Sequence, residues 1–249
     1  MKPVSMEIVS RTNKGRVRSI NEDSVAVLPD LGLAILADGM GGYDAGEVAS
    51  QLAVETIAKG LIMLVQNPQA EMGYREIESV VRTANQAIFD AIDNEHGAAG
   101  MATTVVVSVF TENRVLFAHL GDSRLYRYAD EALEQLTSDH SIIQELVDQG
   151  MFFSIKEAME AGVPNNVLTR GLGVEVEIRL DIGESELVDD DVYILCSDGL
   201  TNMVSDDEMV AIFKECQGDL ESVAERLLAD ALKAGGLDNI SLVLARVKK

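Results

Sequence analysis

The sequence predicts an α+β protein built as a four-layer αββα sandwich, in which two antiparallel sheets lie between two pairs of helices. Short apolar, strand-like runs occur in groups that are separated by two blocks of helical periodicity. Such segregation favours α+β over a doubly wound parallel sheet. Each helical block also carries an apolar stripe, which a pair of sheets covered on both outer faces would bury. We expect residues 1–249 to form one domain.

The first half of the chain alternates between these two patterns. Strand-like runs are expected at 6–10, 23–28 and 33–37. The next segment has apolar residues at Val48, Leu52, Ile57 and Leu61, and a second amphipathic segment extends from Ile77 to Ile92. Apolar residues three or four positions apart predict a pair of helices after the first strands.

The second half returns to strands and closes with helices and a strand. Strands are expected at 103–110, 114–120, 124–128, 177–180, 192–196 and 241–247, and helices at 141–149, 205–216 and 220–234. Ser205 and Glu208 have the spacing of a capping box, which predicts where the first of the last two helices begins. The segment 151–166 is expected to be a partly helical surface insert.

Charge and composition exclude several classes of function. The chain has 20 basic and 42 acidic residues, a net charge of −22. This balance argues against nucleic-acid or anionic-membrane partners, which require clustered Lys and Arg. Two cysteines are too few for a disulfide framework. With no leader-like segment and no uninterrupted stretch of about 18 apolar residues, we expect a soluble cytoplasmic protein.

Four aspartates share an unusual context. Asp38, Asp122, Asp198 and Asp238 each stand at a strand end or just beside a strand, next to Gly or Asn. One interpretation is that they are ordinary turn formers. If the strand ends converge, however, the carboxylates repel one another and require positive charge. An all-oxygen ligand set favours Mg²⁺ or Mn²⁺ over zinc.

Seven motifs make the interpretation more specific. They are Arg18-Ser-Ile-Asn-Glu-Asp23, Ala37-Asp-Gly-Met-Gly-Gly42, Met101-Ala-Thr-Thr104, Gly121-Asp-Ser-Arg124, Leu168-Thr-Arg170, Cys196-Ser-Asp-Gly-Leu200 and Asp238-Asn-Ile-Ser241. The motifs occur in the order in which the metal-dependent protein phosphatase family has them. The sequence therefore resembles this family, also called type 2C protein phosphatases, and particularly its compact bacterial members. The motifs span nearly the whole chain.

The resemblance implies a set of metal ligands. Asp38 would bridge two Mn²⁺ or Mg²⁺ ions, and the Gly39 carbonyl and Glu22, through water, would complete one of the two sites. The remaining ligands would be Asp198 and Asp238 for the other site, and Asp122 with Asp198 for a third, weaker ion that many bacterial relatives bind.

The resemblance also implies the roles of the residues around the ions. Arg18 would be catalytic together with Asp38 and would grip the substrate phosphate. Asn239 would bind the substrate together with Arg18. Asn239 and Asp23 would also be supporting residues close to the metal ligands. Asp23 and Asn239 are equally compatible with ordinary turn positions.

The reaction implied is hydrolysis of phosphoserine or phosphothreonine on proteins by direct attack of a water activated between the two ions. The expected partners are phosphoproteins, with a separately encoded Ser/Thr kinase, and the chain is expected to be a monomer. Two rival functions remain open. One is a catalytically weak, phosphoprotein- or kinase-binding regulatory module of the same fold, and the other is a metal-dependent phosphodiesterase.

Two features depart from the family or stay open. Met40 and Tyr43 stand where relatives have histidine, so the general acid is unassigned. His119 and His140 are more typical of structural residues. The insert 151–166 corresponds in position to a mobile flap of bacterial relatives, and it fits a surface excursion and a substrate-discriminating lid equally well.

Overall fold

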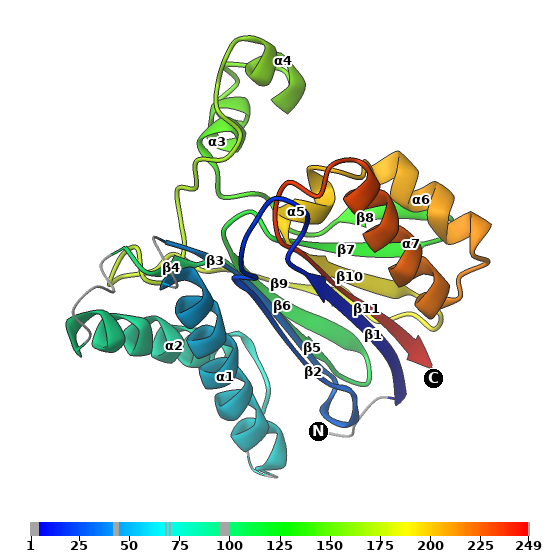
Figure 1. The fold of residues 1–249 in the computed structure, drawn as a ribbon. Coiled ribbons are helices and arrows are strands. Elements are labelled where there is room, and N and C mark those ends of the chain that lie inside the picture. Colours follow the sequence, from blue (N-terminus) through cyan, green and yellow to red (C-terminus); the bar gives the residue numbers. More distant parts are fainter. Residues whose placement is uncertain (1–4, 42–44, 68, 70, 95–99, 249) are drawn as a thin grey trace.

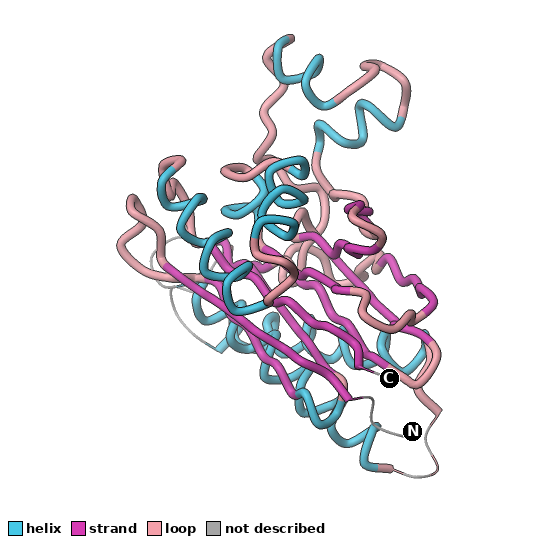
Figure 2. Tube along the Cα trace, turned by 90° about the vertical axis from the view of Figure 1, so that its right-hand side faces the viewer, coloured by secondary structure: helices cyan, strands magenta, loops and turns pink. Residues whose placement is uncertain are grey.

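The computed structural model describes residues 5–41, 45–67, 69, 71–94 and 100–248. Two antiparallel sheets are stacked face to face, with one pair of long helices on each outer side (Figure 1). Figure 2 shows the strands lying between the two groups of helices. The predicted α+β sandwich is therefore confirmed.

One sheet has six strands, with β4 beside its main path. Its order is β2 (Asp23–Leu28), β3 (Leu33–Met40), β5 (Val105–Phe110), β6 (Arg114–Leu120) and β9 (Asp181–Glu186), and β4 (Ala102–Thr103) pairs with the end of β3. A 3-10 turn, Pro29–Leu31, connects β2 to β3. In this register Asp23 stands opposite Asp38.

The other sheet has five strands. Its order is β1 (Ser5–Asn13), β11 (Ile240–Lys248), β10 (Val192–Cys196), β7 (Arg124–Ala129) and β8 (Ala132–Gln135). The short helix α5 (Asp198–Thr201) follows β10. Because β10 and β11 are antiparallel neighbours, the end of the first and the beginning of the second lie at the same edge.

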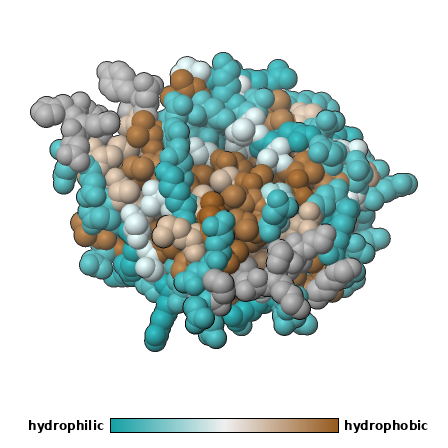
Figure 3. All heavy atoms as spheres, turned by 90° about the horizontal axis from the view of Figure 1, so that it is seen from below, coloured by the Kyte–Doolittle hydropathy of each residue, from teal (hydrophilic) through white to brown (hydrophobic). Residues whose placement is uncertain are grey.

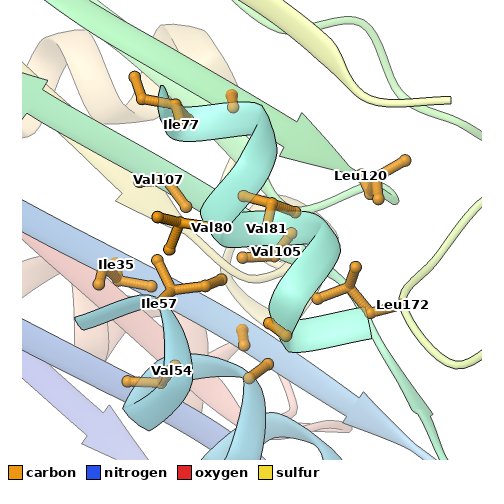
Figure 4. Close-up of a cluster of buried hydrophobic side chains, with 14 of the residues drawn as sticks. Ile35, Val54, Ile57, Ile77, Val80, Val81, Val105, Val107, Leu120 and Leu172 are labelled. Atoms are coloured by element: carbon orange, nitrogen blue, oxygen red, sulfur yellow. The ribbon is translucent and has the colours of Figure 1, made fainter. Parts of the chain in front are cut away.

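Helices cover both outer faces. The helices α1 (Ala45–Gln66) and α2 (Tyr74–Asn94) pack on the six-stranded sheet, and α6 (Asp206–Glu215) and α7 (Leu220–Lys233) pack on the other sheet. Successive side chains of β3 point to opposite faces of the sheet, so some pack against the helices and others against the second sheet. Ile35 faces the helices with Ile57 and Val81 (Figure 4), whereas Leu36 is buried between the sheets.

The helix α1 is long and apolar enough to cross a membrane, judged by length and composition alone. In the structure one of its faces is buried against β3 and α2, with Ala53, Ile57 and Leu61 fully covered. A helix that packs in a protein core can have the same length and composition as one that crosses a membrane. The opposite side of α1 carries Glu55 and Lys59.

The segment between β8 and β9 leaves the sandwich. It contains α3 (Ile142–Asp148) and α4 (Ile155–Glu160), which pack on each other and project from one end of the molecule in both views (Figures 1 and 2). Figure 3 shows the opposite end, where apolar side chains gather at the centre of the face between polar ones.

Three details differ from the sequence prediction. The strand predicted at 177–180 is wrong, because the strand begins at Asp181. The side chain of Asn85 donates to the carbonyls of Glu175 and Val176 and accepts from the N–H of Gly173, so these backbone groups bond to a helix instead of to a strand. The short elements β8 and α5 were not predicted.

Candidate functional site

The predicted site residues meet in one pocket. A cavity of about 410 Å³ is lined by Arg18, Glu22, Asp38, Gly39, Asp122, Asp198 and Asp238. All of the residues predicted as catalytic or as metal ligands therefore face the same space. The pocket lies at the end of the sandwich where α5 is seen in Figure 1.

Strand topology explains this convergence. Asp38 lies near the end of β3, and Glu22 directly precedes β2, the antiparallel neighbour of β3. Asp198 follows β10, and Asp238 precedes β11, which pairs with β10. Each pair of acidic residues therefore comes from one sheet, and the stacking of the sheets brings the two pairs together.

Two glycines allow the chain to approach itself closely at this end. A Cβ atom on Gly39 would lie 2.0 Å from the carbonyl oxygen of Gly46, in the first turn of α1. A Cβ atom on Gly199 would lie 1.9 Å from the carbonyl oxygen of Asn239. Side chains at either position would push apart the segments that carry the aspartates.

Burial and mutual repulsion raise the pKa values of Asp38, Asp122 and Asp198. Burial, followed by the charges of Asp23, Asp198 and Asp122, raises the pKa of Asp38 well above its ordinary value. Burial and the charge of Asp198 raise the pKa of Asp122 to about 7. The pKa of Asp198 is also raised, by burial and then by the charge of Asp238. Positive charge in this pocket would be strongly favoured.

Arg18 supplies part of that charge. Its Nη2 donates to Oδ2 of Asp238 over 2.7 Å, and this bond is the main cause of the raised pKa of Arg18. About half of the Arg18 side chain is exposed, so the guanidinium reaches the pocket from the solvent side. Arg170 is a second arginine on the wall.

The donor set fits a hard divalent cation. The side chains facing the pocket offer carboxylate oxygens, and Gly39 adds a backbone carbonyl. Oε1 of Glu22 is buried without a hydrogen-bond partner in the part of the chain that the structure describes. A buried, unsatisfied carboxylate oxygen is costly unless something binds it. Oxygen ligands of this kind select Mg²⁺ or Mn²⁺.

Two threonines fix the backbone of Asp38, and sequence reasoning gave them no role. The N–H of Asp38 donates to Oγ1 of Thr104 over 3.0 Å, and the carbonyl of Asp38 accepts from Oγ1 of Thr103 over 2.8 Å. The N–H of Thr104 donates to the same carbonyl. Both threonines lie in one of the seven motifs, which was the available signal.

Asn239 is buried and is absent from the pocket lining. Its Oδ1 accepts from the N–H of Glu22, and its Nδ2 donates to the carbonyls of Lys14 and Ile20. All of these partners belong to the loop that carries Arg18. The predicted substrate contact of Asn239 stays a prediction, and in this geometry the Asn239 amide is engaged in holding that loop.

Asp23 lies beneath the pocket and is also buried. Its Oδ2 accepts from Oγ of Ser197 over 2.9 Å, and its Oδ1 has no partner among the described residues. Burial, opposed by hydrogen bonds from Ser241 and Ser197, raises its pKa to about 7. Burial therefore favours the protonated, neutral form of Asp23 in the metal-free protein.

The general acid is still unassigned. Met40 lines the pocket, and Tyr43 lies outside the described residues. His119 and His140 are buried and do not line the pocket. No histidine of the described part of the chain therefore faces the carboxylates.

A second cavity of about 510 Å³ adjoins the first and shares Asp122, Asp198 and Asp238 with it. Its outer wall includes Ile155 and Met159 of the α4 region. Apolar side chains of the projecting segment therefore line the same cavity as three of the carboxylates.

Comparisons with known proteins agree with this arrangement. Residues 13–234 match the family model described as protein phosphatase 2C. The serine/threonine phosphatase stp of Listeria monocytogenes serotype 4b is 36% identical over 94% of this chain and 93% of its own length.

Solved structures give the same result. The crystal structure of the Mycobacterium tuberculosis serine/threonine phosphatase PstP/Ppp superposes with a TM-score of 0.87, at 34% identity, over 98% of this chain and 99% of that one. The catalytic domain of PstP in complex with two manganese ions superposes with a TM-score of 0.83, at 36% identity, with the same coverage. The chain belongs to the protein phosphatase 2C family.

Proposed function

We propose that this chain is a metal-dependent protein serine/threonine phosphatase that hydrolyses phosphomonoesters with Mn²⁺ or Mg²⁺. The observation that carries the proposal is the single pocket in which Glu22, Asp38, Asp122, Asp198 and Asp238 face one another beside an arginine. The two manganese ions of the related PstP catalytic domain support this choice of cofactor.

Asp38, with Glu22 and the Gly39 carbonyl on one side and Asp198 and Asp238 on the other, would hold the two ions. Asp122 with Asp198 would hold a third. When bound, the ions supply the charge that brings the pKa of a water molecule towards neutrality, which makes this water a nucleophile. The water oxygen bonds to phosphorus while the bond from phosphorus to the serine or threonine oxygen breaks.

Arg18 would orient the phosphate. A guanidinium can form two parallel hydrogen bonds to phosphate oxygens, and its present partner, Asp238, is itself a proposed ligand. Binding of ions at Asp238 would release Arg18 for the substrate. The loop that carries Arg18 is held by Asn239, so the guanidinium starts from a defined position.

The test is turnover of a phosphothreonine peptide with Mn²⁺, compared for wild type, Asp38→Asn and Asp198→Asn. Loss of a residue that only supports a metal ligand already costs about 10–100-fold, so loss of a ligand should lower kcat/KM by about 100-fold or more. Asp93→Asn, an exposed position at the end of α2, is the matched control and should be fully active.

Three outcomes would contradict the proposal. Turnover that survives both substitutions, or that persists in EDTA, would exclude the metal mechanism. Binding of the peptide without turnover would favour the regulatory module. Faster turnover of an aryl phosphodiester than of the peptide would favour the phosphodiesterase.

We also propose that the insert 151–166 acts as a lid over the substrate polypeptide. Ile155 and Met159 line the cavity that adjoins the carboxylates, and this position supports the proposal. Met159→Ala should raise the KM for a phosphopeptide several-fold and leave the KM for a small aryl phosphate unchanged. Met63→Ala, on the exposed side of α1, is the control. Equal effects on both substrates would contradict the lid.

The partners and location remain proposals as well. Phosphoproteins require a kinase, and we propose a separately encoded Ser/Thr kinase. We further propose a cytoplasmic protein that is a monomer, and the net charge of −22 supports the monomeric state through repulsion between copies.

A further inference from the structure

His140 is buried outside the pocket but is bonded to two segments that form its wall. The backbone N–H of His140 donates to the carbonyl of Gly121 over 2.9 Å. The backbone N–H of Gly121 donates in return to the ring nitrogen Nδ1 of His140 over 3.2 Å. The carbonyl of His140 accepts from the N–H of Thr169. Gly121 precedes Asp122, and Thr169 precedes Arg170, which lines the pocket.

The hydrogen bonds fix the state of the imidazole. Because Nδ1 accepts from a backbone N–H, the proton of the neutral ring is on Nε2, which lies 3.1 Å from Oδ2 of Asp181. Burial and the neighbouring His119 lower the pKa of His140 to about 4, so the ring is neutral at pH 7. Asp181 also accepts from Nη1 of Arg170 over 3.0 Å.

His119, His140 and Asp181 have the composition of a metal site, with ligand atoms within 4.8 Å of one another. Two observations argue against it. Nη1 of Arg170 lies 3.2 Å from Nε2 of His140 and is bonded to Asp181, so a cation already occupies this position. The two imidazoles are stacked 4.5 Å apart and 17° from parallel, so their in-plane lone pairs do not converge on one ion.

The turn that His140 holds is closely packed. Gly121 has φ of 101°, and a Cβ atom there would lie 2.6 Å from the side chain of Thr104. Thr104 in turn holds the backbone of Asp38 through two hydrogen bonds. A displaced Gly121 would therefore move Asp122 directly and would disturb Asp38 through Thr104.

We propose that His140 is a positioning residue that fixes the Gly121–Asp122 turn through its Nδ1 and links this turn, through Nε2 and Asp181, to Arg170, which also lines the pocket. The proposal rests on the proposed function in one respect, because it takes Asp122 as a metal ligand. It adds a residue that touches neither ions nor substrate.

Two substitutions distinguish the role of Nδ1 from the role of Nε2. His140→Asn places an amide oxygen near the position of Nδ1, so it retains an acceptor for the N–H of Gly121 and loses the link to Asp181. His140→Gln extends towards Asp181 and leaves the N–H of Gly121 without its acceptor. Mn²⁺ affinity is measured by titration calorimetry at pH 7 without substrate, and kcat and KM are measured on a small aryl phosphate.

We expect His140→Gln to weaken Mn²⁺ binding about 10-fold, the lower end of the range for residues that orient metal ligands. His140→Asn should remain within about 3-fold of wild type, as a rescue of the turn. The control His119→Gln changes the neighbouring buried ring, whose Nε2 bonds to the carbonyl of Ser138. It should lower the unfolding temperature and leave Mn²⁺ affinity unchanged.

Asp181→Asn gives a second measurement if His140→Gln fails to fold. Its side chain is about half exposed, so folding should survive, and Mn²⁺ binding should weaken about 3-fold. Wild-type Mn²⁺ affinity in either His140→Gln or Asp181→Asn would overturn the proposal, as would an equal loss in His119→Gln. A wild-type protein that neither binds Mn²⁺ nor turns over phosphate would instead overturn the proposed function.

Discussion

Asp23 should make the stability of the metal-free protein fall as the pH rises. Its carboxyl group is buried, and its pKa is raised from 3.8 to about 7. The folded protein therefore holds a proton that the unfolded chain releases above about pH 4. The stabilisation is complete below the unfolded pKa and is lost as the pH rises through the folded pKa.

The expected magnitude follows from the size of the shift. A difference of about three pH units corresponds to about 4 kcal/mol at 1.36 kcal/mol per unit. Of this, about 3 kcal/mol should be lost between pH 5 and pH 8. The series begins at pH 5 because the isoelectric point is near 4.4.

The variant Asp23→Asn removes this titration, since an amide is neutral throughout. Its NH₂ group would take the place of the unpartnered Oδ1, which costs about 1–3 kcal/mol at every pH. The difference in the free energy of unfolding between variant and wild type should therefore grow by about 3 kcal/mol in favour of the variant from pH 5 to pH 8.

The assay is urea unfolding followed by circular dichroism on protein stripped of divalent ions, at pH 5, 6, 7 and 8. Asp93→Asn, an exposed aspartate, is the control and should follow the wild type. Parallel curves for Asp23→Asn and wild type would refute the reasoning, because they would mean that the Asp23 carboxyl titrates alike in the folded and unfolded states.

Three further substitutions test the packing and the helix ends. Gly199→Ala should destabilise the fold by about 3 kcal/mol in urea unfolding, because the new Cβ meets the carbonyl of Asn239, whereas Gly73→Ala should cost less than about 0.5 kcal/mol. Ser205→Ala should lower stability by about 1 kcal/mol, seen as a fall of about 2–4 °C in Tm, with unchanged kcat. Phe153→Ser should change the free energy of unfolding by less than about 0.5 kcal/mol, since 98% of the side chain is exposed, and a larger loss would indicate unrecognised packing.

Local signals in the sequence predicted local structure well. Ser205 and Glu208 lie three residues apart and form the predicted capping box, with the N–H of Ser205 donating to Oε2 of Glu208 over 2.8 Å. The apolar periodicities of the helices and most strands were equally informative. Each of these interactions depends on neighbours within one turn or one strand, so a short window contains the necessary information.

Contacts between distant segments were not predictable in the same way. The strand expected at 177–180 is absent, and the segment just before it is held by Asn85, about 90 residues earlier in the chain, which bonds to backbone groups at 173–176. In the site, the aspartates could be predicted from their positions at strand ends. The bonds from Thr104 to Asp38 and from Asn239 to the Arg18 loop could not, because they depend on how the sheets are stacked.

The distribution of the carboxylates over the two sheets connects chemistry with stability. Asp38 lies in the six-stranded sheet and Glu22 directly precedes one of its strands, whereas Asp198 and Asp238 lie next to the ends of two strands of the five-stranded sheet. Bringing these side chains together is unfavourable in the metal-free protein, because buried carboxylates repel one another, and a typical domain is stabilised by only about 5–15 kcal/mol. Ions bound between the two pairs would offset this cost and add about 2.7 kcal/mol at a concentration of 100 Kd. In the proposed function, Glu22 and Asp38 from one side and Asp198 and Asp238 from the other would hold the ions, so that the site of water activation would also join the two sheets.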